Sequence, residues 1–250
     1  LKIRHLLSES YEKLGMLHKA AESYKNILLF DDENGDIMYK LGLIYKELED
    51  YNNAQKYFID LINCKGATLE SQYELGISYA LQGNLMQAAV ILNQALEISP
   101  QHAETKYHLS YIYIQMELYN EASLLLKDYI HTYEDDSIAL FLLGKCYLKL
   151  KDYENGLSYF KQAYQINQDD YRIIFNQAIC HFKLGDFNEA AKFFKKTVRI
   201  EPSHSLAHYN LGKTYFLLGK KREANKQLNA LWMINQAYHD SLKLFISSND

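Results

Sequence analysis

The sequence repeats itself every 34 residues, and this period constrains the fold more than any other feature. Four Leu-Gly pairs, which begin at residues 41, 75, 143 and 211, are separated from one another by multiples of 34 residues. The two prolines, Pro100 and Pro202, are separated by three such periods. A period of this size is the signature of stacked structural repeats. Seven units follow one another without insertion, at residues 1–34, 35–68, 69–102, 103–136, 137–170, 171–204 and 205–238.

Several columns of the aligned units keep one kind of side chain. The eighth position is always small, and the twentieth is always Ala or Gly. The eleventh is Tyr in six units and His181 in the other. The twenty-fourth is always large and apolar, with Tyr24, Phe58, Leu92, Leu126, Phe160, Phe194 and Leu228. Small residues at two positions and a large one at a third predict two helices that approach closely and are packed by one side chain.

Each unit contains two amphipathic stretches of about 13 residues, joined by a short turn. Gly15, Gly83, Gly185 and Gly219 occupy the same place in that turn, where a left-handed backbone ends a helix. The chain has only 2 Pro and 11 Gly in 250 residues, and 48% of it is hydrophobic, which favours helices over disorder or a turn-rich β fold. A single helix pair cannot bury its apolar face, so neighbouring pairs must stack. We predict an all-α protein, a right-handed α-solenoid with a concave groove.

These units resemble the tetratricopeptide repeat, whose pattern is W-x₂-L-G-x₂-Y, then A-x₃-F, then P. The third and seventh units match best: the third has Leu75-Gly76, Tyr79, Ala88 and Pro100, and the seventh has Leu211-Gly212, Tyr215 and Ala224. The resemblance covers residues 1–238, although no unit has Trp at the fourth position, and Gln177 makes the sixth unit divergent. It implies a non-catalytic scaffold that binds a peptide segment or a partner protein in its concave groove.

Residues 239–250 follow the seventh unit and have the character of another first helix. Their eighth position is Ile246, which is not small. We expect a capping helix over the seventh unit, with a truncated eighth repeat as the alternative.

Signals for catalysis or metal binding are weak. Gly212-Lys213-Thr214 lacks the first glycine of a phosphate-binding loop and lies in a predicted helix. His204 and His208 have no Cys or carboxylate at ligand spacing. Cys146 and Cys180 share the tenth position of adjacent units, which predicts buried, inert thiols. We therefore expect no metal, no cofactor and no enzymatic activity from these residues.

Charge is distributed unevenly along the chain. Residues 1–136 hold 11 Lys and Arg against 21 Asp and Glu, whereas residues 137–250 hold 16 against 10. A nucleic-acid-binding domain is normally basic throughout, so nucleic acid is a disfavoured partner. Asp36, Glu70 and Glu104 occupy the second position of units two to four. We expect a basic partner segment there.

Three features of the sequence bear on the cellular compartment of the protein. Three scattered cysteines favour a reducing compartment, so we expect a cytoplasmic protein. No apolar run reaches the length of a membrane span. The first residue is Leu rather than Met, so we expect a processed or trimmed chain, in which an upstream leader or anchor would not be visible.

A candidate peptide-binding face lies on units five to seven. Positions 2, 5, 6, 9, 12 and 13 share one side of a first helix, and the resemblance implies that this side lines the groove. Some relatives use an Asn at position 6 to hold the backbone of a bound peptide, and Asn176 and Asn210 match that position. Tyr209 lies at position 5, where partial burial in the core is the alternative role. The cationic candidates are Lys145, Lys149, Arg172, Lys183 and Lys213, and the apolar candidates are Leu148, Phe182 and Phe216. Amides, cations and an apolar strip suit an acidic segment with apolar residues.

Two other functions remain open at this stage. The repeats could belong to a larger enzyme, such as a glycosyltransferase, or to a signalling protein, with catalysis outside these residues. They could also form a structural subunit of an assembly. In that case a basic ridge on the outer face, with Lys192, Lys195, Lys196 and Arg199, could meet phosphates, or it could simply be solvated.

Overall fold

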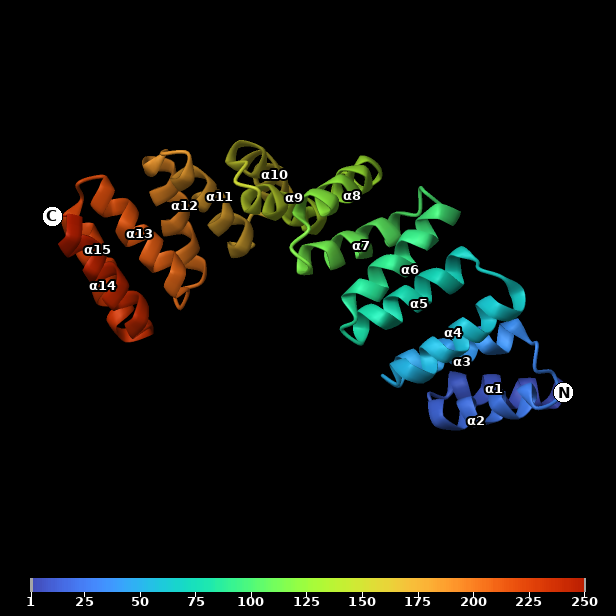
Figure 1. Ribbon diagram of the computed structural model, residues 1–250. Coiled ribbons are helices and arrows are strands. Elements are labelled where there is room, and N and C mark those ends of the chain that lie inside the picture. The colour runs from blue at the N-terminus through green and yellow to red at the C-terminus, as the bar shows by residue number, and fades with distance from the viewer. Residues whose placement is uncertain (1, 250) are drawn as a thin grey trace. The chain divides into compact units, whose positions relative to one another are not determined.

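The computed structural model describes residues 2–249. Leu1 and Asp250, which belong to the predicted first unit and terminal segment, lie outside the described residues. Residues 2–249 form fifteen α-helices and no strand (Figure 1). The chain divides into two compact units, Leu1–Leu118 and Tyr119–Asp250, and we describe each by itself.

The first compact unit contains seven helices of the described chain, and each packs against its neighbour in sequence. They are α1 (Lys2–Lys13), α2 (Leu17–Leu28), α3 (Gly35–Glu47), α4 (Tyr51–Lys65), α5 (Leu69–Leu81), α6 (Leu85–Ile98) and α7 (Ala103–Gln115). First and second helices of the repeats alternate, so α3, α5 and α7 each begin on the first residue of a predicted 34-residue unit.

The second compact unit contains the remaining eight helices of the described chain. They are α8 (Tyr119–Thr132), α9 (Ser137–Lys149), α10 (Tyr153–Ile166), α11 (Tyr171–Lys183), α12 (Phe187–Ile200), α13 (Ser205–Leu217), α14 (Lys221–Ile234) and α15 (Gln236–Asn249). Here α9, α11 and α13 are first helices, and they carry all the predicted peptide-binding residues.

The last residue of a 34-residue unit explains where the next first helix begins in units one to six. Asn34 accepts a hydrogen bond from the backbone N–H of Ile37 at 3.1 Å, and Asp170 accepts one from Arg172 at 2.9 Å. His204 does the same through Nδ1, which lies 3.1 Å from the backbone nitrogen of Ala207. These side chains satisfy donors that have no partner in the first turn of a helix.

The turn between the two helices of a repeat contains the fifteenth residue of the 34-residue unit, and this residue has a left-handed backbone conformation. Gly15 has φ of 68°, as the glycine pattern predicts. Glu49, Glu117 and Lys151 adopt the same conformation, with φ of 58°, 61° and 63°. Non-glycine residues have a steric cost in this conformation, so these three turns are left-handed although the local sequence does not favour it.

Close approach of the paired helices depends on the small eighth position. A Cβ atom at Gly42 would lie 2.5 Å from Cε1 of Phe58. At Gly144 it would lie 2.7 Å from Cε1 of Phe160. Both phenylalanines occupy position 24 and are fully buried, which confirms the packing predicted from these columns.

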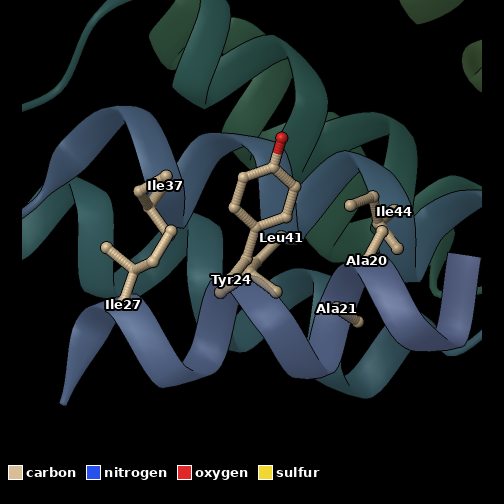
Figure 2. Packing of buried hydrophobic residues seen from close by; sticks show 7 residues of the cluster. All are labelled: Ala20, Ala21, Tyr24, Ile27, Ile37, Leu41 and Ile44. Carbon is tan, nitrogen blue, oxygen red and sulfur yellow. The ribbon is translucent and has the colours of Figure 1, made fainter. Parts of the chain in front are cut away.

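Successive repeats are joined by a second apolar layer, which Figure 2 shows between α2 and α3. Ile27 lies beside Ile37 at one end of this layer, and Ala20 lies beside Ile44 at the other. The seven buried residues of the layer are Ala20, Ala21, Tyr24, Ile27, Ile37, Leu41 and Ile44. The hydroxyl of Tyr24 reaches past the layer and donates to Oε2 of Glu12 at 2.8 Å.

The terminal helix begins earlier than the sequence predicted. α15 starts at Gln236 rather than at residue 239. Asn235 ends α14 with φ of −159°, and its Oδ1 accepts a hydrogen bond from the backbone N–H of Tyr238 at 3.2 Å. Tyr238 stands where the other repeats have a capping side chain, so Asn235 supplies the cap three residues earlier. α15 packs against both α13 and α14 and buries Leu242 completely.

Candidate functional site

The predicted binding residues lie on one face of three first helices in the second compact unit. Lys145, Leu148 and Lys149 are on α9. Arg172, Asn176, Phe182 and Lys183 are on α11, and Tyr209, Asn210, Lys213 and Phe216 are on α13. None of the positions 2, 5, 6, 9, 12 and 13 of these three helices holds Asp or Glu. We call this surface the lysine–aromatic face.

Lys213 is the centre of one cluster on this face. Its Nζ lies 5.8 Å from the ring centre of Phe182, 5.4 Å from that of Tyr209 and 4.6 Å from that of Phe245. Three helices, α11, α13 and α15, therefore supply aromatic faces to one ammonium group. A cation near aromatic rings is stabilised by their electron-rich faces.

The charge of Lys213 is not compensated by an acid. No carboxylate pairs with it in residues 2–249. Burial lowers the pKa of Lys213, and the nearby positive charge of Lys183 lowers it further. A partly buried ammonium with no anion beside it is left with unsatisfied electrostatics, which a bound anion would relieve.

A second cluster surrounds Phe141 on α9. Nζ of Lys145 and Cζ of Arg172 each lie 5.7 Å from the centre of this ring. Arg172 is also held by Asp170, whose oxygens accept from Nη2 at 2.6 Å and from Nε at 2.9 Å. The guanidinium keeps the pKa of the Asp170 carboxyl below its usual value. Arg172 is thus neutralised by its own cap residue, and we expect it to offer less charge to a ligand than the sequence suggested.

The two asparagines at position 6 have equivalent conformations. Nδ2 of Asn176 donates to the carbonyl of Arg172 at 2.7 Å, and Nδ2 of Asn210 donates to the carbonyl of Leu206 at 2.9 Å. Each side chain is bonded back to its own helix and is partly buried. One N–H and the Oδ1 of each amide are left for a ligand.

The remaining candidates differ in their surroundings. Phe182 packs edge-on against Phe187, with ring centres 5.4 Å apart, and Phe216 packs edge-on against Phe245 at 5.7 Å. Leu148 is partly buried against the core of α10 and α11. Lys149 and Lys183 are exposed, and no acid pairs with either of them in the described part of the chain.

Phe141 and Phe245, whose rings lie beside the cations of this face, were absent from the predicted set. Phe141 belongs to the aromatic fifth column, of which Tyr209 alone was among the predicted binding residues. Phe245 is on α15. This helix begins at Gln236, three residues before the start that the repeat period predicts, so its residues cannot be assigned to the positions of a repeat. The signal for Phe141 was present in the sequence, whereas the role of Phe245 required the tertiary structure.

The first compact unit has an acidic pocket of about 230 Å³, where we expected a basic partner. Its lining combines aromatic rings and carboxylates, with Tyr39, Leu69, Glu70, Tyr73, Glu74, His102 and Glu104. Glu74 pairs with Lys46, and Oε2 of Glu104 lies 3.3 Å from Nε2 of His102. Burial, followed by the nearby glutamates, raises the pKa values of Tyr39 and Tyr73. The pocket therefore has an excess of negative charge.

The buried thiols are unsuited to chemistry. Cys146 and Cys180 are completely buried, as predicted, and burial raises the pKa of each to about 12. A thiol reacts as its thiolate, which is scarce at neutral pH under these conditions. Residues 212–214 lie inside α13, where the backbone N–H groups belong to the helix. In residues 2–249, no helix has the length and apolar character needed to cross a membrane.

The outer basic ridge is partly used by the fold itself. Lys192 pairs with Glu189 at 3.2 Å, and Nζ of Lys196 donates to the carbonyl of Gln168 at 3.1 Å. Lys195 and Arg199 line a separate cavity of about 530 Å³ that also contains the carboxylate of Glu223. These internal pairings favour a solvated ridge over a phosphate site.

Helix pairs of constant length, stacked through repeated apolar layers, define a helical-repeat protein with an all-α solenoid fold. A family model of the tetratricopeptide repeat matches residues 79–146 and 181–243, which is more than half of the chain. Two further models of the same repeat match residues 135–203 and 35–63. The chain therefore belongs to the tetratricopeptide repeat family, as the sequence pattern predicted.

Solved structures with the same fold have low sequence identity. YrrB, a TPR protein with an unusual peptide-binding site, is 22% identical with a TM-score of 0.67 over 76% of this chain and 99% of YrrB. The C-terminal part of a TPR repeat-containing protein from Cytophaga hutchinsonii is 15% identical and has a TM-score of 0.78. The match covers 94% of this chain and 97% of that structure. MamA from Desulfovibrio magneticus is 19% identical and has a TM-score of 0.63. The match covers 68% of this chain and 96% of the MamA structure. No curated protein matches the chain.

Proposed function

We propose that the protein is a non-catalytic interaction scaffold whose lysine–aromatic face binds an acidic segment of another protein. The observation that carries this proposal is Lys213, a partly buried ammonium with three aromatic neighbours and no carboxylate partner in the described residues. A carboxylate bound there would compensate the charge, and the surrounding rings would cover an adjacent apolar side chain.

The rest of the face supports the same ligand. Lys145, Lys149 and Lys183 add positive charge, and none of positions 2, 5, 6, 9, 12 and 13 of the three helices is an acid. Asn176 and Asn210 each keep an N–H and an oxygen that can pair with the backbone of an extended segment. The relative YrrB also has a peptide-binding site, which is in line with this proposal.

The proposal can be tested with a fluorescent nonapeptide in which Glu alternates with Leu and Phe. Fluorescence anisotropy should show saturable binding that is at least tenfold tighter than for the same peptide with Gln in place of Glu. Lys183→Met with Lys213→Met should remove this preference for Glu. Lys19→Met with Lys56→Met, which removes the same charge from the first compact unit, should leave it unchanged.

The asparagines provide a second readout. Asn176→Ala with Asn210→Ala should weaken binding of both peptides, because each lost hydrogen bond costs about 0.5–1.5 kcal/mol. Circular dichroism should show unchanged helicity. If the lysine pair and the asparagine pair both leave binding of the Glu peptide unaltered, the lysine–aromatic face is not the binding site.

A second segment of opposite charge would fit the first compact unit. The acidic pocket combines Tyr39 and Tyr73 with three glutamates, one of which, Glu74, pairs with Lys46. An Arg or Lys side chain suits such a pocket because it can bind carboxylates and lie against aromatic rings at once. An Arg-containing peptide should bind, and Glu70→Gln with Glu104→Gln should weaken it, whereas its citrulline analogue should not bind.

A further inference from the structure

Three successive first helices of the first compact unit carry an acid and a tyrosine at the same two positions. The pairs stand on α3, α5 and α7 (Figure 1), at positions 2 and 5: Asp36 with Tyr39, Glu70 with Tyr73, and Glu104 with Tyr107. Each acid is exposed and each tyrosine is half-buried. Residues three apart on a helix are neighbours on one face, so each acid lies beside a ring. We call these six residues the acid–tyrosine ladder.

Cavities lie between the rungs of the ladder. Asp36, Tyr39 and Glu70 line a cavity of about 680 Å³, which also contains Leu61. Tyr39 and Glu70 line the acidic pocket of about 230 Å³ as well, together with Glu104. Because the two cavities share a ring and a carboxylate, they are adjacent along one track that crosses α3, α5 and α7.

The track has negative charge that the protein leaves uncompensated. No cation pairs with Asp36 or Glu70 in residues 2–249. Glu104 lies beside His102, which is charged only when it is protonated. The larger cavity is lined by four acids and one lysine, Lys65. A segment with several cations is therefore complementary in charge to the ladder.

The spacing of the rungs constrains the conformation of that segment. α3 contacts α5, and α5 contacts α7. Helices in contact lie about 8–10 Å apart, so an acid recurs at about this interval across the track. A polyproline II helix rises about 3.1 Å per residue with three residues per turn, so every third side chain points the same way about every 9 Å. In a β-strand, side chains three apart point to opposite faces.

Each rung also favours one kind of cation. The guanidinium of arginine can donate two hydrogen bonds to a carboxylate and stack on an aromatic ring at once, whereas the ammonium of lysine is a point charge. An acid with a tyrosine beside it suits the first arrangement. The ladder thus matches arginines that recur at every third residue.

The chain itself does not supply such a segment. Nowhere in the 250 residues do three Lys or Arg stand at positions i, i+3 and i+6, so a second copy is not the occupant. We propose that the acid–tyrosine ladder binds a polyproline-type segment of a partner protein in which arginine recurs at every third residue. This inference rests on the proposal that the first compact unit binds a basic segment, and it adds the spacing and conformation of that segment.

Three fluorescent nonapeptides test the spacing. Each contains three Arg and six Pro, with Arg at positions 1, 4 and 7, at positions 1, 3 and 5, or at positions 1, 5 and 9. They have the same charge and the same polyproline conformation, so only the spacing differs. Anisotropy at physiological salt should show the first peptide binding at least tenfold tighter than the other two. Lys in place of Arg should weaken the first peptide.

Variants of the protein locate the binding surface. Glu70→Gln removes the middle carboxylate and should weaken the first peptide at least fivefold. Glu97→Gln, on α6, is the matched control, because it removes the same charge from the same compact unit and should have no effect. Tyr73→Leu should reduce the preference for Arg over Lys. Glu70 and Glu97 are both exposed, so both glutamine variants should keep their helicity by circular dichroism.

The outcomes separate this inference from the proposal on which it rests. Equal binding of the three peptides would overturn the spacing and leave a basic-segment site in place. Absence of binding by all three would overturn both. A helical peptide with Arg at every seventh residue also repeats at about 10 Å, and tighter binding of that peptide would overturn the polyproline conformation.

Two further results would overturn the surface or its occupant. Equal weakening by Glu70→Gln and Glu97→Gln would mean that net charge, rather than the ladder, attracts the peptide. The full polypeptide from its natural source should bind the first peptide as tightly as residues 1–250 do. If it does not bind, a segment of the same polypeptide occupies the ladder in place of a partner.

Discussion

The carboxylate of Asp170 holds the guanidinium of Arg172 through three hydrogen bonds, and the closest joins Oδ2 to Nη2 at 2.6 Å. The same carboxylate caps α11 by accepting from the backbone N–H of Arg172. One side chain therefore both starts the helix and neutralises the arginine that the sequence assigned to ligand binding. The charge available on the lysine–aromatic face is consequently set by a cap residue outside the face.

Asp170→Ser should separate these two roles. Serine is also a good cap, so α11 should keep its start, whereas Arg172 becomes free to meet an acidic ligand. We expect binding of the Glu-containing peptide to tighten about two- to fivefold, the usual range for a partly exposed charge. Asp152→Ser is the control, because Asp152 caps α10 through Asn155 and Asn155 carries no charge. Equal affinity of both variants would show that Arg172 does not contribute.

His204→Asn should reduce the sensitivity of the fold to mild acid. His204 caps α13 through Nδ1, which must be unprotonated to accept the N–H of Ala207. Burial lowers the pKa of His204, so its stabilising effect is present above the unfolded value of about 6.5 and is lost as pH falls through the lower folded value. Asparagine caps without titrating, as Asn34 does for α3.

The measurement for His204→Asn is urea unfolding at several pH values between 5 and 8. The variant loses ring packing against Phe175, at 4.7 Å between centres, so it should be less stable than the parent at pH 8. Its free energy of unfolding should fall less steeply toward pH 5. Parallel curves for the two proteins would mean that the protonation of His204 is not coupled to folding.

Gly144→Ala should destabilise the protein although alanine favours helices. Alanine in place of glycine gains about 1 kcal/mol in a helix. The added Cβ would lie 2.7 Å from Cε1 of Phe160, and such overpacking costs about 1–3 kcal/mol. Denaturant unfolding should show a net loss. Adding Phe160→Leu should recover part of the lost free energy of unfolding. If a double-mutant cycle shows no coupling between the two substitutions, the close contact between positions 144 and 160 is contradicted.

Thiol labelling should distinguish the three cysteines. Cys64 is partly exposed, whereas Cys146 and Cys180 are buried with pKa values raised to about 12. A disulfide exchange reagent at pH 8 should rapidly label one thiol in the folded protein and three in denaturant. Cys64→Ser should abolish the rapid phase. Rapid labelling of a second thiol would show that the apolar layer around Cys146 or Cys180 is more open than in this structure.

Much of the repeat architecture could be predicted because the interactions behind it are local or periodic. Position 34 caps the next helix through a side chain only a few residues away, as Asn34 does. Positions 8 and 24 meet within one helix pair, so Gly42 and Phe58 could be matched from their columns alone. The candidate site was harder to predict, because Lys213 gains Phe245 from a helix outside the repeat alignment.

The amino-acid sequence by itself determined the 34-residue period, the small and large packing positions and the family, since these depend on spacings that recur along the chain. Tertiary structure decided which cations are uncompensated, where α15 begins and which apolar positions lie open. Arg172 and Lys213 are both basic residues of first helices, and only the neighbours that folding brings to them make Arg172 neutralised and leave Lys213 without a carboxylate partner among residues 2–249.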